Sequence, residues 1–149
     1  MLLSAHFSLE ELIATQHREI DNTPSPEVVN NLQLLSKETL EAVRYLLGPL
    51  HINSGYRSVE LNAAVGGQPT SQHCEGLAAD FICPRYSLRE CARRILEGSV
   101  VFDQLIYEFG GWIHISHAPA GRPPRGDKLM VGKWTTGKYL PLDLTLVPS

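Results

Sequence analysis

The sequence predicts an α+β domain, because helix-like and strand-like patterns occupy different parts of the chain. Up to Gly48-Pro49, apolar residues recur at helical spacing. Later segments, above all residues 77–82 and 112–116, are short and rich in apolar and β-branched residues, which is typical of strands. No linker divides the 149 residues, and a chain of this length can bury its own core, so we expect one domain over residues 1–149.

Two helices are expected in the first third of the chain. Ser8 and Glu11 have the spacing of a capping box, which favours a short helix from that point. Ser25-Pro26 is a typical start for a longer helix, because serine caps the first turn and proline fits its first position. Apolar residues continue at helical spacing to Leu46, and Gly48-Pro49 ends this helix.

The middle of the chain predicts strands separated by turns and one helix. Residues 50–53 are expected to form a short strand, followed by a turn at Ser54-Gly55. A helix over residues 59–65 ends where two glycines follow. Residues 77–82 form the next expected strand.

The last third predicts a helix and then a hairpin. Residues 87–96 are expected to be helical, with a serine as the cap. Residues 104–109 and 112–116 predict a β-hairpin. A Pro/Gly-rich surface loop at residues 119–126 precedes a last strand near residues 138–142.

His73 and Asp80 form one half of a candidate metal site. Small and apolar residues surround Asp80, as in a buried strand. A buried carboxylate requires a compensating cation or hydrogen-bond donors, and no Lys or Arg occurs between Arg57 and Arg85. Gly76 lets the chain bend so that both side chains can reach one ion. Either residue alone is better explained as a turn aspartate or a surface histidine, but together they favour a metal.

His114 supplies the other half of the candidate site. Ile113 and Ile115 flank it in a strand-like run, so the isoleucines point to one face of the strand and His114 to the other. His117 points with the isoleucines or lies beyond the strand end, which makes it the weaker ligand candidate. Three N/O ligands leave a fourth position open, as in catalytic zinc sites. Taken alone, His114 is better explained as a half-buried strand histidine bonded to a neighbour.

Five sequence motifs lie between residues 54 and 116, and residues 6–12 and 21–24 belong to the same pattern, which covers roughly residues 6–117. The five motifs are Ser54-Gly55-Tyr56-Arg57-Ser58, Val65-Gly66-Gly67, Ser71-Gln72-His73 with Asp80, Asp103-Gln104-Leu105-Ile106 with Glu108, and Trp112-Ile113-His114-Ile115-Ser116. In this order they resemble the zinc D-alanyl-D-alanine carboxypeptidase family, which includes peptidoglycan-cleaving phage endolysins and shares a fold with the hedgehog signalling domain. The resemblance implies a small, mainly antiparallel sheet with helices packed on it and a zinc site at strand ends. The tail from about residue 119 lies outside these motifs.

The same resemblance implies roles for individual residues. It implies a Zn2+ ion bound by His73, Asp80 and His114, and Arg57 as a cation that binds substrate and takes part in catalysis. A planar guanidinium suits a substrate carboxylate or carbonyl, although a salt bridge to a distant acid is the alternative. Further substrate-binding candidates, also explicable as turn or core residues, are Tyr56, Ser71, Gln72 and Trp112.

Glu108 is the nearest acid before His114 and is the candidate general base. The family's carboxylate often lies closer to the last ligand, where this chain has Gly110-Gly111. With a two-residue loop at the glycines, Glu108 points to the isoleucine face and cannot serve. With a three-residue loop that includes Phe109, Glu108 pairs with Trp112 and shares the face of His114. We favour the longer loop, because a zinc hydrolase needs a proton acceptor and the isoleucine face is a poor place for a charge.

Charge and hydropathy exclude several other classes of protein. The formal net charge is −3 and basic residues are scattered, so we expect no nucleic-acid partner. Arg122, Arg125 and Lys128 form a local basic patch, better explained as a solvated turn than as a phosphate site. No apolar run could insert into a membrane, and residues 1–6 lack the basic start and apolar core of a secretory signal.

The three cysteines, Cys74, Cys83 and Cys91, predict free thiols. They are odd in number and lack Cys-x-x-Cys spacing, which favours a reducing compartment over a disulfide framework; one disulfide is the alternative. Cys74 is next to His73 and could compete for the metal. We expect a monomer that is cytoplasmic on synthesis and reaches the cell wall only if released, as a phage endolysin helped by a holin would be.

Three classes of function follow from these observations. The first is a zinc metallopeptidase that hydrolyses peptidoglycan stem peptides as a carboxypeptidase or an endopeptidase, by metal-assisted attack of water. The second is a cell-wall-binding module that keeps zinc without turnover. The third is a structural virion or cell-wall component that uses the same fold. The intact ligand set and Arg57 favour the peptidase.

Overall fold

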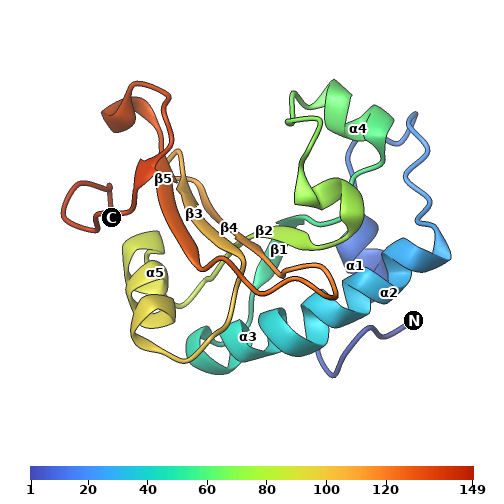
Figure 1. The fold of residues 1–149 in the computed structure, drawn as a ribbon, viewed down its shortest axis with the longest axis horizontal. Coiled ribbons are helices and arrows are strands. Elements are labelled where there is room, and N and C mark those ends of the chain that lie inside the picture. The colour runs from blue at the N-terminus through green and yellow to red at the C-terminus, as the bar shows by residue number, and fades with distance from the viewer.

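A computed structural model describes residues 1–149 and shows helices packed around a six-stranded sheet (Figure 1). The α-helices are α1 (Leu9–Ile13), α2 (Pro26–Leu35), α3 (Glu41–Leu47), α4 (Val59–Ala64) and α5 (Leu88–Glu97). The strands are β1 (His51–Ser54), β2 (Ala78–Ile82), β3 (Gln104–Glu108), β4 (Trp112–Ser116), β5 (Asp127–Val131) and β6 (Leu140–Pro141). A π-helix, η1 (Ser36–Leu40), and two 3-10 turns, η2 (Gln72–Glu75) and η3 (Lys133–Thr135), complete the fold.

The sheet has the order β1-β2-β4-β3-β5-β6, and only β3 and β5 are parallel neighbours. This arrangement confirms the predicted α+β class with a mainly antiparallel sheet. Its register brings one row of side chains together, because His114 on β4 pairs with Asp80 on β2 and with Ile106 on β3. In Figure 1, α3 and α5 lie on one side of the sheet and α4 on the other.

The predicted long helix extends without interruption from α2 through η1 to α3. Ser25 caps it by accepting a hydrogen bond from the Val28 N–H, and Pro26 occupies its first position. Gly48 ends it with φ 81°, a value that glycine adopts at no steric cost. No helix of the structure combines the length and the apolar character that a membrane crossing requires.

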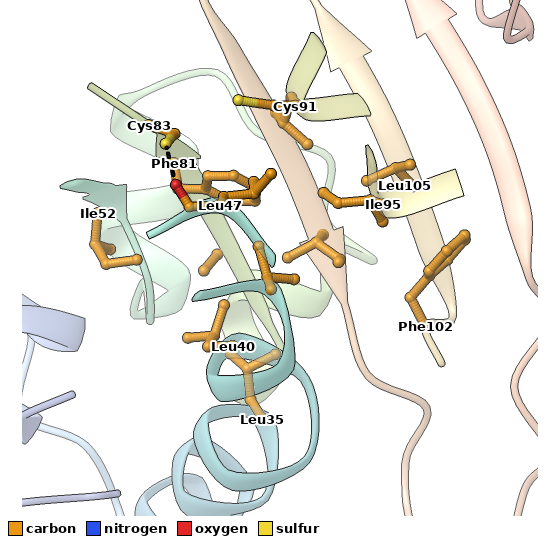
Figure 2. Packing of buried hydrophobic residues seen from close by; sticks show 14 of the residues in the cluster. Leu35, Leu40, Leu47, Ile52, Phe81, Cys83, Cys91, Ile95, Phe102 and Leu105 are labelled. Atoms are coloured by element: carbon orange, nitrogen blue, oxygen red, sulfur yellow. Dashed lines mark hydrogen bonds between the residues drawn. The ribbon is translucent and has the colours of Figure 1, made fainter. Parts of the chain in front are cut away.

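The core lies between this helix, α5 and one face of the sheet (Figure 2). Leu40 and Leu47 of the long helix and Phe81 of β2 are fully buried in it. Cys83 is also buried and donates its Sγ–H to the Leu47 carbonyl at 3.1 Å. None of the three cysteines forms a disulfide, as predicted.

The tail beyond residue 119 belongs to the same core and corrects the predicted strands. The segment after the Pro/Gly loop forms β5, a strand that the sequence analysis missed, and β5 pairs in parallel with β3. The strand predicted near residues 138–142 is reduced to the two residues of β6. Parallel strands such as β3 and β5 are not joined by a tight turn, so the sequence contains no hairpin pattern that would predict their pairing. Val147, near the end of the chain, is 1% exposed.

Burial on the long helix predicts unequal costs for two neighbouring truncations. Leu47→Ala is expected to lower the free energy of unfolding by about 3 kcal/mol, because it removes buried methyl groups and leaves a cavity. Tyr45→Ala, at a side chain that is 91% exposed, should change it by less than about 0.5 kcal/mol. Urea denaturation of the two variants checks this, and equal losses would contradict the packing described.

Candidate metal centre and active site

A cleft of about 620 Å³ lies on the sheet face opposite the core. Its lining includes Asp80, Ile106, Glu108 and His114 from three neighbouring strands, together with residues 65–68 and 70–73. The strand residues between them point the other way, into the core. The cleft is therefore a direct product of strand alternation.

His73, Asp80 and His114 meet in this cleft, as predicted. The Asp80 Oδ1 lies 3.2 Å from Nε2 of His73 and 3.0 Å from Nδ1 of His114. One candidate ligand atom from each residue lies within 4.8 Å of the other two. All three residues are less than 9% exposed. The strand-face prediction is also confirmed, since Ile113 and Ile115 are fully buried in the core while His114 lines the cleft.

Local geometry around η2 carries His73 to the strand residues. The Ser71 Oγ accepts a hydrogen bond from the His73 N–H at 3.1 Å and so starts this 3-10 turn. Gly76 ends it with φ 74°, and a Cβ at this position would come within 2.9 Å of the Val28 backbone oxygen. Only glycine fits there, which agrees with the bend predicted between His73 and Asp80.

The donor set fits a divalent metal ion. The Nδ1 of His73 lies 2.7 Å from the Gly55 carbonyl, so the single N–H of a neutral ring points there and leaves the lone pair of Nε2 facing Asp80. This lone pair and the Asp80 carboxylate are both hydrogen-bond acceptors, so their contact requires either a second proton on the ring or a cation between them. Two imidazole nitrogens and one carboxylate are ligands that zinc accepts, and the Gly55 carbonyl orients the ring as outer partners of metal-bound histidines do.

Asp80 also contacts Arg57, which the sequence predicts to bind substrate. Arg57 Nη2 donates to Asp80 Oδ2 at 3.3 Å, while its Nε donates to Ser54 and its Nη1 to Asn62. Burial acts to raise the pKa of Asp80, but its electrostatic and hydrogen-bonding interactions with His73 and His114 outweigh burial and hold this pKa well below its ordinary value. The carboxylate is therefore ionised, with one oxygen on Arg57 and the other toward the histidines.

Glu108 faces the metal ligands, as the favoured loop requires. Glu108 pairs with Trp112, and residues 109–111 form the three-residue loop. The Glu108 Oε1 lies 3.9 Å from Nδ1 of His114, and the carboxylate side chain is 14% exposed. Burial raises the pKa of Glu108 to about 7, against the opposing influence of His114. A carboxyl group with such a pKa can both accept and return a proton near neutral pH.

The other predicted residues divide between the cleft and the core. Ser71, Gln72 and Trp112 line the cleft with Arg57. Tyr56 does not, which corrects its assignment to the groove: its side chain packs against the core and its N–H donates to the Leu12 carbonyl.

Two residues next to the predicted ligands stay outside the metal group. His117 follows the end of β4, and its Nδ1 lies 2.6 Å from the Ala118 carbonyl, as expected of the weaker candidate. Cys74 is also not a member of the group, and burial raises the pKa of its thiol, which favours the protonated form.

Sequence reasoning missed an ion-pair network beside the cleft. Asp103 is fully buried and accepts hydrogen bonds from the guanidinium groups of Arg122 and Arg125 at 2.7 to 3.1 Å. Gln72 Nε2 donates to the same carboxylate at 2.9 Å. The loop that carries the predicted basic patch is exposed, as the favoured interpretation requires, but Arg122 and Arg125 also hold it onto Asp103. The one sequence feature that indicates this network is Asp103 itself, a single acid in an otherwise apolar stretch.

The fold and the grouped ligands define a protein of the metallopeptidase class. Residues 5–116 match the family described as Peptidase M15. The chain therefore belongs to the peptidase M15 family, which confirms the predicted family and enzyme class. Over 50 residues it is 42% identical to a zinc D-Ala-D-Ala carboxypeptidase from Streptomyces albus G. That alignment covers 32% of this chain and 20% of the relative, so the chain spans only a minor part of that protein's length.

Metal affinity is expected to depend on three side chains without redundancy. His73→Ala, Asp80→Ala and His114→Ala should each weaken zinc binding by more than about a hundredfold, while His117→Ala should leave it nearly unchanged. Competition with a chromophoric chelator measures these affinities. Intact binding in His114→Ala together with its loss in His117→Ala would contradict the assignment.

Acid stability is expected to depend on Asp103. Burial acts to raise its pKa, but hydrogen bonds from Arg122, Arg125 and Gln72 outweigh it and hold the pKa far below the ordinary value of 3.8. As the pH falls, the Asp103 carboxylate is protonated in the unfolded chain before it is protonated in the folded protein. Its contribution to the free energy of unfolding is therefore present above the ordinary pKa and is lost as the pH falls from about 5 to 2. Asp103→Asn should lower the free energy of unfolding by about 2 kcal/mol at pH 7 and flatten its acid dependence.

The matched control is Asp127→Asn, at a carboxylate whose side chain is 42% exposed. Guanidinium denaturation between pH 7 and pH 3 should show nearly the same acid dependence for this variant as for the parent protein. An unaltered acid dependence in Asp103→Asn would show that Arg122 and Arg125 contribute little.

Proposed function

We propose that the protein is a zinc-dependent peptidase that hydrolyses peptide bonds in the stem peptides of peptidoglycan. The observation that carries this proposal is the meeting of His73, Asp80 and His114 with Glu108 in one cleft of a peptidase M15 chain. The name of the partial relative, a zinc D-Ala-D-Ala carboxypeptidase, supports zinc and a D-alanyl peptide as the substrate class. The 620 Å³ cleft is large enough for several peptide residues.

The residues of the cleft have separate roles in the proposed hydrolysis. His73, Asp80 and His114 would hold the zinc ion, which when bound would supply Lewis-acid chemistry and a water that is nucleophilic near neutral pH. Glu108 lies on the same sheet face and accepts the proton of the attacking water, then passes it to the leaving amine. Arg57 holds Asp80 by one carboxylate oxygen, which orients the other oxygen toward the histidines.

Arg57 also lines the cleft, so its guanidinium has a second use. Its side chain is 16% exposed and already donates to Ser54, Asn62 and Asp80. A substrate carbonyl or carboxylate at the cleft surface can share the remaining N–H groups, because a guanidinium carries five. Arg57 thus combines the predicted substrate contact with the positioning of a metal ligand.

Glu108→Gln is expected to abolish turnover while zinc binding persists. The amide keeps the shape of the side chain but takes up no proton, so kcat should fall by at least about a hundredfold. Glu60→Gln, an exposed acid on α4, is the control and should retain full activity. Turnover is measured on peptidoglycan fragments, with bound zinc determined in the same samples. Near-normal activity in Glu108→Gln would remove Glu108 from the mechanism.

Mass spectrometry of digested sacculi tests the proposed substrate. A carboxypeptidase shortens stem peptides by one terminal residue, whereas an endopeptidase separates cross-linked fragments or cuts within the stem. Either change should disappear with a chelator and return with added zinc. Zinc-dependent adsorption to sacculi without any new fragment would instead favour the binding module.

We also propose the biological setting that the resemblance implies, in which the protein acts as an endolysin that reaches the cell wall only after release from the cytoplasm. Added protein should reduce the turbidity of permeabilised Gram-negative cells, and intact cells that make the protein internally should stay whole until their inner membrane is opened. Lysis before the membrane is opened would contradict a need for release.

A further inference from the structure

Phe109 has a backbone conformation that its residue type disfavours. Its φ is 58°, and Gly110 follows with φ 69°. The Gly111 N–H donates to the Glu108 carbonyl at 3.0 Å, which closes a turn whose two central residues both have positive φ. Asn and Gly are preferred at such positions. The Phe109 N–H also donates to the Val131 carbonyl at 2.8 Å, an interaction that any residue except proline can make.

The Phe109 side chain contributes little to the core. It is 55% exposed, and its ring lies 5.6 Å from that of Trp112, measured between centroids, at an angle of 46°. Both rings line the cleft that contains Glu108 and His114. A strained residue with an exposed ring beside reactive groups points to a role in the cleft rather than in folding.

The position of Glu108 decides which part of a substrate meets these rings. In the proposed function, Glu108 returns a proton to the leaving amine, so that amine comes within about 3 Å of its carboxylate. Phe109 follows Glu108 in the chain, and Trp112 pairs with Glu108 across the hairpin. The residue that carries the leaving amine therefore lies next to the two rings.

We propose that Phe109 is a specificity-determining residue, whose ring, together with that of Trp112, receives an apolar side chain on the residue that leaves with the new amino group. This proposal rests on the proposed function and adds the preferred chemistry of one substrate position. The rings offer an apolar surface without a charge, so they favour an aliphatic side chain over none.

The test compares acylated peptides that have D-alanine before the scissile bond and glycine, D-alanine or D-leucine after it. The parent protein should prefer D-leucine to glycine by about tenfold in KM, because each methylene that is buried contributes to binding. In Phe109→Asn, whose side chain suits the turn but offers no ring, the preference should fall to about twofold or less, with a melting temperature equal to or above that of the parent.

Thr136→Asn is the matched control. Thr136 is the other non-glycine residue with positive φ, at 53°, and it is exposed outside the cleft. Its replacement relieves the same kind of strain and should leave the peptide preference intact. A loss of preference in both variants would assign the effect to backbone strain and overturn the proposal, as would an unchanged preference in Phe109→Asn.

Calorimetric titration separates this inference from the proposed function. The three peptides are titrated into zinc-loaded Glu108→Gln protein and into the same protein with Phe109→Asn added. Failure of the parent protein to cleave any of them would count against cleavage of these D-alanyl peptides, while the ratio of Kd values for D-leucine and glycine peptides would still report on Phe109. Equal ratios in the two titrated proteins would refute the role of Phe109.

Discussion

The burial of the Asp80 carboxylate is the constraint around which the cleft is organised. An ionised group in a strand with apolar neighbours is tolerated only where positive or hydrogen-bonding partners surround it. The pairing of β2 with β4 brings His114 opposite it, η2 brings His73 from one side, and the turn after β1 brings Arg57 from the other. Each of these segments is held near one negative charge, and together they define where a cation can bind.

Much of this site could be predicted from local sequence patterns. The alternation around Ile113 and Ile115 was sufficient to place His114 on the cleft face, because strand periodicity is short-range and one face had to be apolar. The same physical argument, that a charge avoids the isoleucine face, selected the three-residue loop that brings Glu108 to His114. The helix boundaries followed from caps and from Gly48, which also act locally.

What could not be predicted depends on contacts between distant segments. The pairing of Arg57 with Asp80 joins residues 23 positions apart, and neither neighbourhood announces it. The arginines that donate to Asp103 come from a loop that the sequence predicts to be solvated. Strand β5 pairs in parallel with β3, and no turn in the sequence indicates this pairing. Tyr56 follows the glycine turn in sequence, yet its partly buried side chain packs against the core, because the direction of a side chain in a turn depends on tertiary packing.

The spacing of the three ligands along the chain links metal binding to folding. Asp80 and His114 are 34 positions apart, so an ion between them closes a long loop that the unfolded chain keeps open. An ion that binds only the folded chain stabilises it by mass action, by about 2.7 kcal/mol at a free concentration one hundred times its Kd. The amount of intact protein in a cell would then follow the supply of free metal, even before any substrate is met.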